Sequence, residues 1–365
     1  MTDLTDLHRI RPDAHRRFVA DRLLALKSRL RGQVHSASDE RSLRLATWNL
    51  MHFGNSGAYT RTTESMMYIA EIIDHFDLVA IQEVNENMDA LRRLMHGHLG
   101  DAWDWIVTDT TEGSRGNRER LAFVYRRSKV RFRKEAGETV LPEGQKIVGP
   151  AGSRSAGREV QFARTPFSVA FQAGWFKFKI CTVHIYYGKA SGAELTHRKR
   201  EIERIAGFLA RRQERERETL GDEANYVLLG DFNIVSPEHE TMQALEGAGF
   251  EVPAGIRNAA SSLSGNHHYD QIAFKLADHR FRALGGGVFD MFAAVYRDAD
   301  ADHYIDVVQP EAFDRDSDGD PRNREQKARY FKRYYRRHQM SDHKLLWVEA
   351  RIDFSDDYLT AFAQG

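Results

Sequence analysis

Polar residues that bind metal ions or move protons recur at the ends of short apolar runs in this chain. Asn49 lies near the end of LRLATWNL, Glu83 lies in AIQEV, and His184 follows ICTV. Further residues of this kind come later in the chain: Asp231 with Asn233, Asp270, and Asp342 with His343. One such residue is readily explained as a turn or cap, but the repeated pattern indicates a catalytic site at the strand ends of an α/β fold.

Most of these side chains are oxygen donors. Carboxylates and amide oxygens suit a hard cation, whereas a zinc site would need clustered Cys and His. The sequence therefore predicts a magnesium site, with manganese as a substitute. The predicted metal ligands are Asn49, Glu83, Asp231 and Asp342.

The elements that would position these residues can be predicted from apolar periodicity. Runs such as ICTVHI and YVLLGDF predict strands, and many such runs alternate with helical patterns. Helices are expected at 60–76, 87–98, 193–218 and 237–247, and the Gly-rich stretch 144–159 is expected to be a loop. Two sheets covered by helices would use all of these elements.

Composition limits the classes of protein that fit. The 365 residues are 41% hydrophobic, which is enough for a sizeable core, and the formal net charge is zero. Attraction to a polyanion therefore requires a local patch. The single cysteine, Cys181, excludes an internal disulfide and fits a reducing compartment. No segment resembles a leader or a membrane span, and we predict a cytoplasmic protein without an obligate protein partner.

Residues 1–40 are expected to form a separate element before the main domain. Leucines alternate with arginines over residues 8–31, which predicts an amphipathic helix ending at Gly32. The helix either packs on the domain that follows or touches an acidic membrane surface, and the first interpretation is preferred.

Six motifs together resemble a known superfamily. ATWNL, IQEV, TVHI, LLGDFN, YDQI and SDH occur in the order typical of endonuclease/exonuclease/phosphatase proteins, which include deoxyribonucleases, abasic-site endonucleases, sphingomyelinases and inositol-polyphosphate phosphatases. The resemblance covers Leu43 to about Phe354. It implies a four-layer αββα sandwich of two mixed β-sheets over residues 41–365, with an insertion at about 290–340.

Two stretches resemble the pancreatic-type deoxyribonuclease branch in particular. GNRERLAFVYRR places Glu119 where a carboxylate orients the imidazole of His184. FARTPFSVAF places Arg164 at the position of an arginine that contacts the substrate phosphate. Each residue also has a simpler interpretation, as a solvated charge at a strand start or as a turn cap.

The chemistry of a phosphodiester assigns expected roles to these residues. Two imidazole–carboxylate pairs, His184 with Glu119 and His343 with Asp270, are expected on either side of the scissile phosphate. Asp231 and His343 both remain candidates for the base that activates water. Asn233 and Arg164 are expected to bind the phosphate.

Some positions depart from the deoxyribonuclease branch. Asn85 and Asn117 stand where that branch has an arginine and a tyrosine that bind the minor groove. These two differences argue against the same mode of binding to duplex DNA in this chain. Met51 replaces an arginine of the WN loop and also differs from abasic-site enzymes. The neighbouring His52 either contacts phosphate or is an exposed loop residue.

The insertion contains two further patterns. Acidic and glycine residues fit a calcium-binding EF-hand loop with ligands at Asp314, Asp316, Asp318 and Glu325, or else form a solvated acidic loop. REQKARYFKRYYRRH mixes cations with aromatic rings, which suits contact with a nucleic acid, or else a helix that buries its rings and exposes its charges.

These observations predict a metal-dependent phosphodiester hydrolase, with nucleic acid as substrate and DNA nicking as its activity. A phosphatase or phosphodiesterase for small or lipid phosphates is the alternative, because the same fold serves both. A binding module without catalysis would lack a ligand or an imidazole, and every expected position is filled here.

Overall fold

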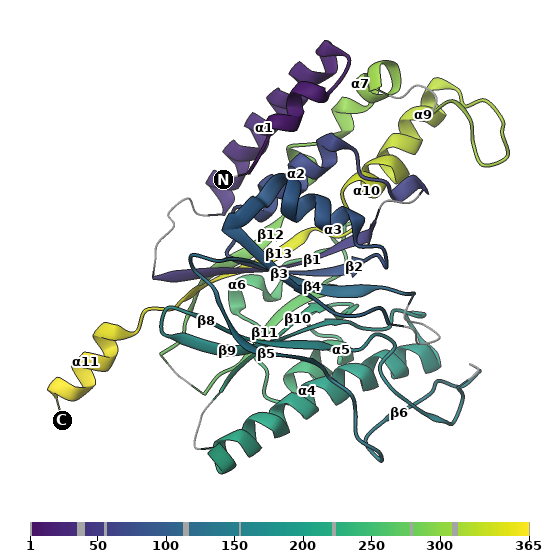
Figure 1. Ribbon diagram of the computed structural model, residues 1–365. Coiled ribbons are helices and arrows are strands. Elements are labelled where there is room, and N and C mark those ends of the chain that lie inside the picture. Colours follow the sequence, from purple (N-terminus) through teal and green to yellow (C-terminus); the bar gives the residue numbers. More distant parts are fainter. Residues whose placement is uncertain are drawn as a thin grey trace.

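The computed structural model describes residues 2–34, 41–54, 57–111, 117–152, 155–220, 224–277, 280–308 and 313–364. Its strands form two sheets that pack against each other, with helices on both outer faces (Figure 1). The first sheet has the strand order β12-β13-β1-β2-β4-β3, and the second has the order β11-β10-β9-β8-β5. Both sheets mix parallel and antiparallel pairs, so the predicted αββα sandwich of two mixed sheets is confirmed.

The strands of the first sheet are β1 (Ser42–Phe53), β2 (Leu78–Val84), β3 (Trp103–Val107), β4 (Arg120–Arg126), β12 (Ala283–Phe289) and β13 (Leu345–Arg351). Those of the second are β5 (Arg131–Glu138), β8 (Phe167–Ala173), β9 (Phe176–His184), β10 (Asn225–Asp231) and β11 (Asp270–Lys275). A separate ribbon pairs β6 (Ile147–Val148) with β7 (Glu159–Val160). The region 144–159, predicted to be a loop, therefore includes strand pairing.

The four predicted helical regions are occupied by α2 (Thr63–Ile73), α3 (Asp89–Leu94), α4 (Gly192–Leu220) and α5 (Glu240–Glu246). The chain also forms α1 (Asp13–Gln33), α6 (Ala254–Arg257), α7 (Ala301–His303), α9 (Arg324–Tyr330), α10 (Arg336–Gln339) and α11 (Ser355–Ala363). Figure 1 shows α1, α2 and α3 outside the first sheet, with α4 and α5 outside the second.

The alternation of side chains along β1 explains why two cores form. Leu43 and Leu45 belong to the core between the sheets, while Trp48 and Leu50 belong to the core beneath the outer helices. Successive strand residues point to opposite faces, so a strand buried on both sides needs apolar residues throughout. The central strands therefore have little sequence freedom and hold the residues at their ends in fixed positions.

Helix α1 covers part of the outer core. Val19, Leu23, Leu26 and Leu30 form one buried stripe, as expected from helical periodicity. Residues 5–9 form a separate 3-10 helix, and α1 begins at Asp13, directly after its N-cap Pro12, and runs through Gly32 to Gln33. None of the described helices has an apolar stretch long enough to cross a bilayer.

A buried carboxylate joins α1 and α2 to the insertion. Glu64 of α2 is 3% exposed and accepts hydrogen bonds from Tyr68 Oη, at 2.9 Å, and from Tyr304 Oη. His15 Nε2 of α1 lies 3.2 Å from the same carboxylate. A buried charge needs such partners, so this cluster fixes the position of the insertion against the sandwich.

Candidate active site

Sheet topology brings the predicted residues to one edge of the sandwich. Strands β1 and β2 run parallel, so Asn49 and Glu83 lie near the same end of the first sheet. Strands β9 and β10 also run parallel, and their last residues, His184 and Asp231, are register partners. A hydrogen bond of 3.1 Å from Asn49 Nδ2 to Asp231 Oδ2 joins the two sheets at this edge.

Antiparallel strands supply the remaining residues from their starts. Asp270 opens β11 and is the register partner of Asp231, and His343 lies just before β13. Glu119 precedes β4, which is antiparallel to β2, and Arg164 precedes β8, which is antiparallel to β9. Parallel strand ends and antiparallel strand starts meet at the same edge, which is why residues so distant in sequence form one site.

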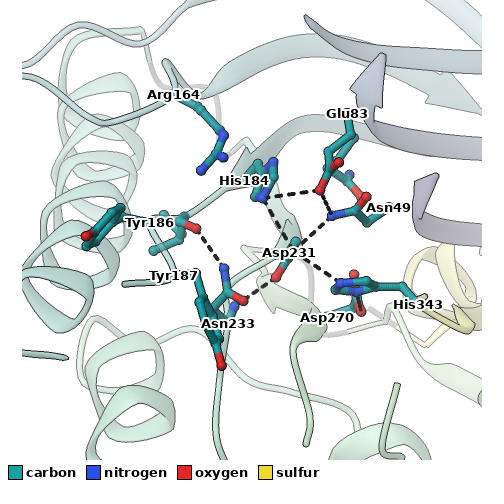
Figure 2. Close-up of polar contacts among 12 residues, drawn as sticks. Asn49, Glu83, Arg164, His184, Tyr186, Tyr187, Asp231, Asn233, Asp270 and His343 are labelled. Carbon is teal, nitrogen blue, oxygen red and sulfur yellow. Dashed lines mark hydrogen bonds and ion pairs between the residues drawn. The ribbon is translucent and has the colours of Figure 1, made fainter. Parts of the chain in front are cut away.

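Asp231 is the centre of the site (Figure 2). Its Oδ2 atom lies 3.6 Å from His184 Nε2 and 3.7 Å from His343 Nε2. Burial tends to raise the pKa of Asp231, but the two imidazoles and hydrogen bonds from Asn49 and Asn233 outweigh burial and lower that pKa. Asp231 is therefore an ionised carboxylate between two imidazoles.

Each of these imidazoles is oriented by a second carboxylate. His184 Nδ1 lies 2.8 Å from Glu119 Oε2, and His343 Nδ1 lies 2.8 Å from Asp270 Oδ2. Both Nε2 atoms consequently face Asp231. Burial lowers the pKa of His343, but Asp270 and Asp231 outweigh burial and hold that pKa well above 6.5. Both predicted imidazole–carboxylate pairs are present in the structure.

Arg164 reaches the site through Glu119. Its Nε and Nη2 atoms donate to the two oxygens of Glu119 at 2.8 and 3.1 Å. Burial opposes the ionisation of Glu119, but His184 and Arg164 together lower the pKa of Glu119 to about 2. Arg164 thus holds the carboxylate that orients His184, and its contact with a substrate phosphate stays a prediction.

The amide of Asn49 connects the two carboxylates at the sheet edge. Its Nδ2 atom donates to Glu83 Oε1 at 2.8 Å as well as to Asp231, while its Oδ1 atom accepts from Met51 N at 2.9 Å. Asn49 therefore orients Glu83 and Asp231 in this structure. Its role as a direct metal ligand stays a prediction.

Two residues of the site have strained backbones. Glu83 has φ +60° and Asn233 has φ +53°, in the left-handed region that side chains with a Cβ rarely adopt. Glu83 accepts a hydrogen bond from His52 N at 2.9 Å, and the Asn233 amide nitrogen donates to Ile185 O at 2.8 Å. Such strain persists where surrounding contacts enforce it, which is common at functional sites.

The donor set fits a hard cation. Glu83 and Asp231 offer carboxylate oxygens, and Asp342 directly precedes His343 in the chain. Ligand atoms of Asp231, Asp270 and His343 lie within 4.8 Å of one another, and Asp270 Oδ1 is buried without a hydrogen-bond partner. An orphaned carboxylate oxygen in an oxygen-rich cluster is consistent with a site for a divalent metal ion.

Gly230, the residue before Asp231, leaves no room for a side chain. Its φ is +132°, and a Cβ atom would lie 2.1 Å from Val183 O of the neighbouring strand. We expect Gly230→Ala to lower the free energy of unfolding by about 3 kcal/mol or more, because both the strain and the clash must be relieved. Urea unfolding measures this change.

Gly32→Ala is the matched control, because an added Cβ there meets nothing within 4 Å. Ala is the better helix former, so the control should be neutral or more stable than the wild type. Equal stability of the two variants would contradict the packing described at Gly230.

The sequence profile of the Endonuclease/Exonuclease/phosphatase family matches residues 46–343, which include every site residue named above. The chain belongs to this family. A curated relative from Thioalkalivibrio sp. (strain K90mix), named "Deoxyribonuclease", is 30% identical over 203 residues, or 54% of this chain. The match spans 48% of that relative, so the chain covers only about half of its length.

Solved structures of the endonuclease/exonuclease/phosphatase family share the fold. One from Bacteroides vulgatus has a TM-score of 0.50 at 14% sequence identity. The match covers 86% of this chain and 99% of the Bacteroides vulgatus chain. One from Bacteroides thetaiotaomicron has a TM-score of 0.50 at 17% identity, with the same coverage of both chains. The resemblance found in the six sequence motifs is therefore confirmed as family membership.

Several residues that adjoin this family site were not predicted from the sequence. Arg198 of α4 donates to Tyr187 O at 2.9 Å and to Asn233 O at 2.9 Å, and so holds the loops that flank Asp231. The Tyr269 ring lies 5.5 Å from the His343 ring and 6.1 Å from that of Tyr187, which is 50% exposed. Tyr269 is the first residue of the motif YDQI, and Tyr187 follows the motif TVHI by two residues. This proximity in sequence is the signal that could have identified the two tyrosines.

The acidic loop of the insertion does not assemble as the EF-hand pattern predicts. Asp314 forms an ion pair with Lys327, and Glu325 lies on α9, 2.8 Å from Arg329. Asp316 accepts hydrogen bonds from the backbone of its own turn. Within the described ranges, only Asp231, Asp270 and His343 form a group of three or more acidic, His or Cys residues with ligand atoms within 4.8 Å of one another. The structure therefore favours an acidic loop over calcium ligation by Asp314, Asp316, Asp318 and Glu325.

The contact between Arg164 and Glu119 leads to a prediction for this family site. Burial and the Arg164 charge both lower the pKa of His184, while Glu119 and Asp231 raise it above 6.5. We expect Arg164→Ala to raise the pKa of His184 further, because a nearby positive charge is removed. Titration of the imidazole by NMR in metal-free protein measures the shift.

Arg324→Ala serves as the control, because Arg324 is paired with Asp302 and Asp306 in the insertion. That variant should leave the His184 titration unchanged. An unchanged or lower pKa in Arg164→Ala would show that Arg164 does not act on His184 through charge.

Proposed function

We propose that this protein is a magnesium-dependent phosphodiester hydrolase that nicks DNA. The main support is the convergence of His184 Nε2 and His343 Nε2 on Asp231 Oδ2, at 3.6 and 3.7 Å. Each imidazole is held at Nδ1 by a buried carboxylate, which fixes the orientation of the opposite nitrogen. Two positioned imidazoles beside an ionised carboxylate provide a proton acceptor and a proton donor for one reaction.

In the proposed reaction, water attacks phosphorus and the bond to the leaving oxygen breaks. Asp231 or His343 removes a proton from the water, and an imidazole gives a proton to the leaving oxygen. The products are one end with a phosphate monoester and one end with a hydroxyl. Arg164 and the second N–H of the Asn233 amide would contact the phosphate. No covalent intermediate is required.

Glu83, Asp231 and Asp342 would hold the metal ion, with Asn49 orienting the first two. The family's chemistry and the oxygen donor set favour Mg²⁺, with Mn²⁺ as a substitute. When bound, the ion supplies positive charge for the negative charge that develops on the phosphoryl and leaving oxygens.

The relative named "Deoxyribonuclease" supports DNA as the substrate. Asn85 and Asn117 support the alternative, a small or lipid phosphate, because they replace expected groove-binding residues. In this structure the Asn117 amide donates to Glu119 Oε1 at 3.1 Å, so it belongs to the support of His184.

Rates on different substrates decide between these two functions. We expect a higher kcat/KM for supercoiled plasmid than for p-nitrophenyl phosphate, a sugar phosphate or sphingomyelin under the same metal conditions. A higher value for one of the small or lipid esters would reject the DNA assignment and retain the phosphoesterase.

A further inference from the structure

A row of aromatic and imidazole rings leads away from Glu83 toward the insertion. His52 Nδ1 lies 3.8 Å from Glu83 Oε2, and the His52 ring is 4.6 Å from that of Tyr59. Tyr59 is 4.8 Å from His338, which in turn is 6.4 Å from Tyr334. These four residues, His52, Tyr59, His338 and Tyr334, are called the ring row below. They connect the site to the surface of the inserted helices.

The inserted helix presents its rings to two different environments. From α9 through a π-helical turn (Phe331–Tyr335) to α10, the chain is continuously helical. Phe331 and Tyr335 are 0% and 6% exposed and join the outer core, whereas Tyr334 is 46% exposed. Tyr334 and His338 are four residues apart and therefore share the outer face. The buried rings fit the interpretation of a helix that packs on the sandwich, and contact of its outer face with nucleic acid stays a prediction.

The helix is anchored beside the site. Gln339 Oε1 accepts hydrogen bonds from Ser65 Oγ at 2.7 Å and from Thr62 N at 3.0 Å, both at the start of α2. Figure 1 shows α10 next to α2 on the outer side of the first sheet. His338 lies on α10, and its ring is 4.8 Å from that of Tyr59, so the ring row runs from this helix toward Glu83.

Most cations of this helix already have carboxylate partners. Ion pairs hold Arg324, Lys327, Arg329, Lys332 and Arg336. Within the part of the chain that the structure describes, Arg333 and Arg337 have no carboxylate within 4.0 Å. The Arg333 guanidinium instead lies 5.7 Å from the Tyr334 ring centroid. Arg333 and Arg337 directly precede Tyr334 and His338 in the sequence, so the same helical turns carry these two cations and two members of the ring row.

We infer that the ring row, Arg333 and Arg337 bind an unpaired nucleic-acid strand that flanks the scissile phosphodiester. This inference rests on the proposed function, because it places the strand relative to that site. Exposed rings stack on bases whose faces are free, and arginines neutralise phosphates between them. A base-paired duplex would offer phosphates to the arginines but no free base faces to the rings.

Binding of fluorescein-labelled oligothymidylate to the full chain in EDTA tests this surface without cleavage. We expect the double variant Arg333→Glu/Arg337→Glu to bind at least about tenfold more weakly, and its slope of log affinity against log salt to fall by roughly 1.4 for two lost phosphate contacts. Tyr334→Ala should weaken binding roughly tenfold without changing the slope, because stacking carries no charge.

Arg329→Glu/Lys332→Glu is the matched control. It reverses two cations of the same helix that already have carboxylate partners, so it makes the same change in net charge. Its affinity should stay within about threefold of wild type. Thermal melting of all variants verifies that each is folded.

Equal losses in the two double variants, or normal strand binding by Tyr334→Ala, would overturn the inference. If the variants lost as much affinity for the complementary duplex as for the single strand, the inference would also be overturned. The surface would then contact only the sugar–phosphate backbone. Hydrolysis of plasmid by the wild type separates the two proposals. If the wild type cleaves plasmid but all variants bind the single strand with equal affinity, only the binding surface is rejected. If the variants show the expected losses of affinity but the wild type cleaves no plasmid, only the proposed function is rejected.

Discussion

His343→Ala should lower kcat for plasmid nicking at least about a hundredfold, and up to about ten-thousandfold, the range typical of a positioned proton-transfer group. His343 is held by Asp270 at 2.8 Å, and its Nε2 faces Asp231 at 3.7 Å, so the variant removes one of the two imidazoles beside Asp231. Single-turnover rates with saturating metal measure the chemical step. His96→Ala, at an exposed position two residues after the end of α3, should retain the wild-type rate.

A change of leaving group distinguishes the roles of the two imidazoles. A p-nitrophenolate leaving group needs no proton, so the imidazole that protonates the leaving oxygen becomes less important with such an ester. One of the variants His184→Ala and His343→Ala should therefore regain hydrolytic activity on a p-nitrophenyl diester. The imidazole that this variant lacks is the one that protonates the leaving oxygen. Near-normal nicking by both variants would reject the two imidazole–carboxylate pairs as catalytic groups.

The second large effect concerns the metal ion. Glu83→Gln keeps the size of the side chain and can still accept from His52 N, but it removes the negative charge offered to the cation. We expect the nicking rate at subsaturating Mg²⁺ to fall by about a hundredfold or more, since a bound metal contributes several kcal/mol to catalysis. The rate as a function of Mg²⁺ concentration should shift to higher concentrations.

Glu86→Gln is the control for this experiment, because Glu86 is exposed and pairs with Arg118 at 2.7 Å. It should leave the magnesium dependence as in the wild type. If Glu83→Gln also had a wild-type dependence, Glu83 would not be a metal ligand.

The site was predictable to the extent that it lies at buried strand ends. Asn49, His184 and Asp231 each follow a run of mostly apolar, buried residues, and short apolar runs that end at polar residues predict buried strands. Their partners Glu119 and Arg164 were found only through the family resemblance. The sequence around each allows a plain strand start or a turn cap, and only the fold brings both to His184.

Edge strands were harder to predict. β5 is charged and largely exposed, and β12 contains three consecutive glycines, so neither has the alternation of a half-buried strand. Both are held mainly by backbone pairing at the edges of their sheets, which leaves little trace in side-chain pattern. The ring row was equally hidden, because Tyr59 and His338 meet only after the insertion folds onto α2.

Plasmid nicking with Mg²⁺ tests the central claim most directly. Purified wild-type protein should convert supercoiled plasmid to open circles with Mg²⁺ and leave it intact in EDTA. Asp231→Asn, which removes the carboxylate between the two imidazoles, should leave the plasmid supercoiled under both conditions. Nicking by Asp231→Asn at the wild-type rate, nicking by the wild type in EDTA, or an intact plasmid with Mg²⁺ would contradict a metal-dependent DNA nuclease centred on Asp231.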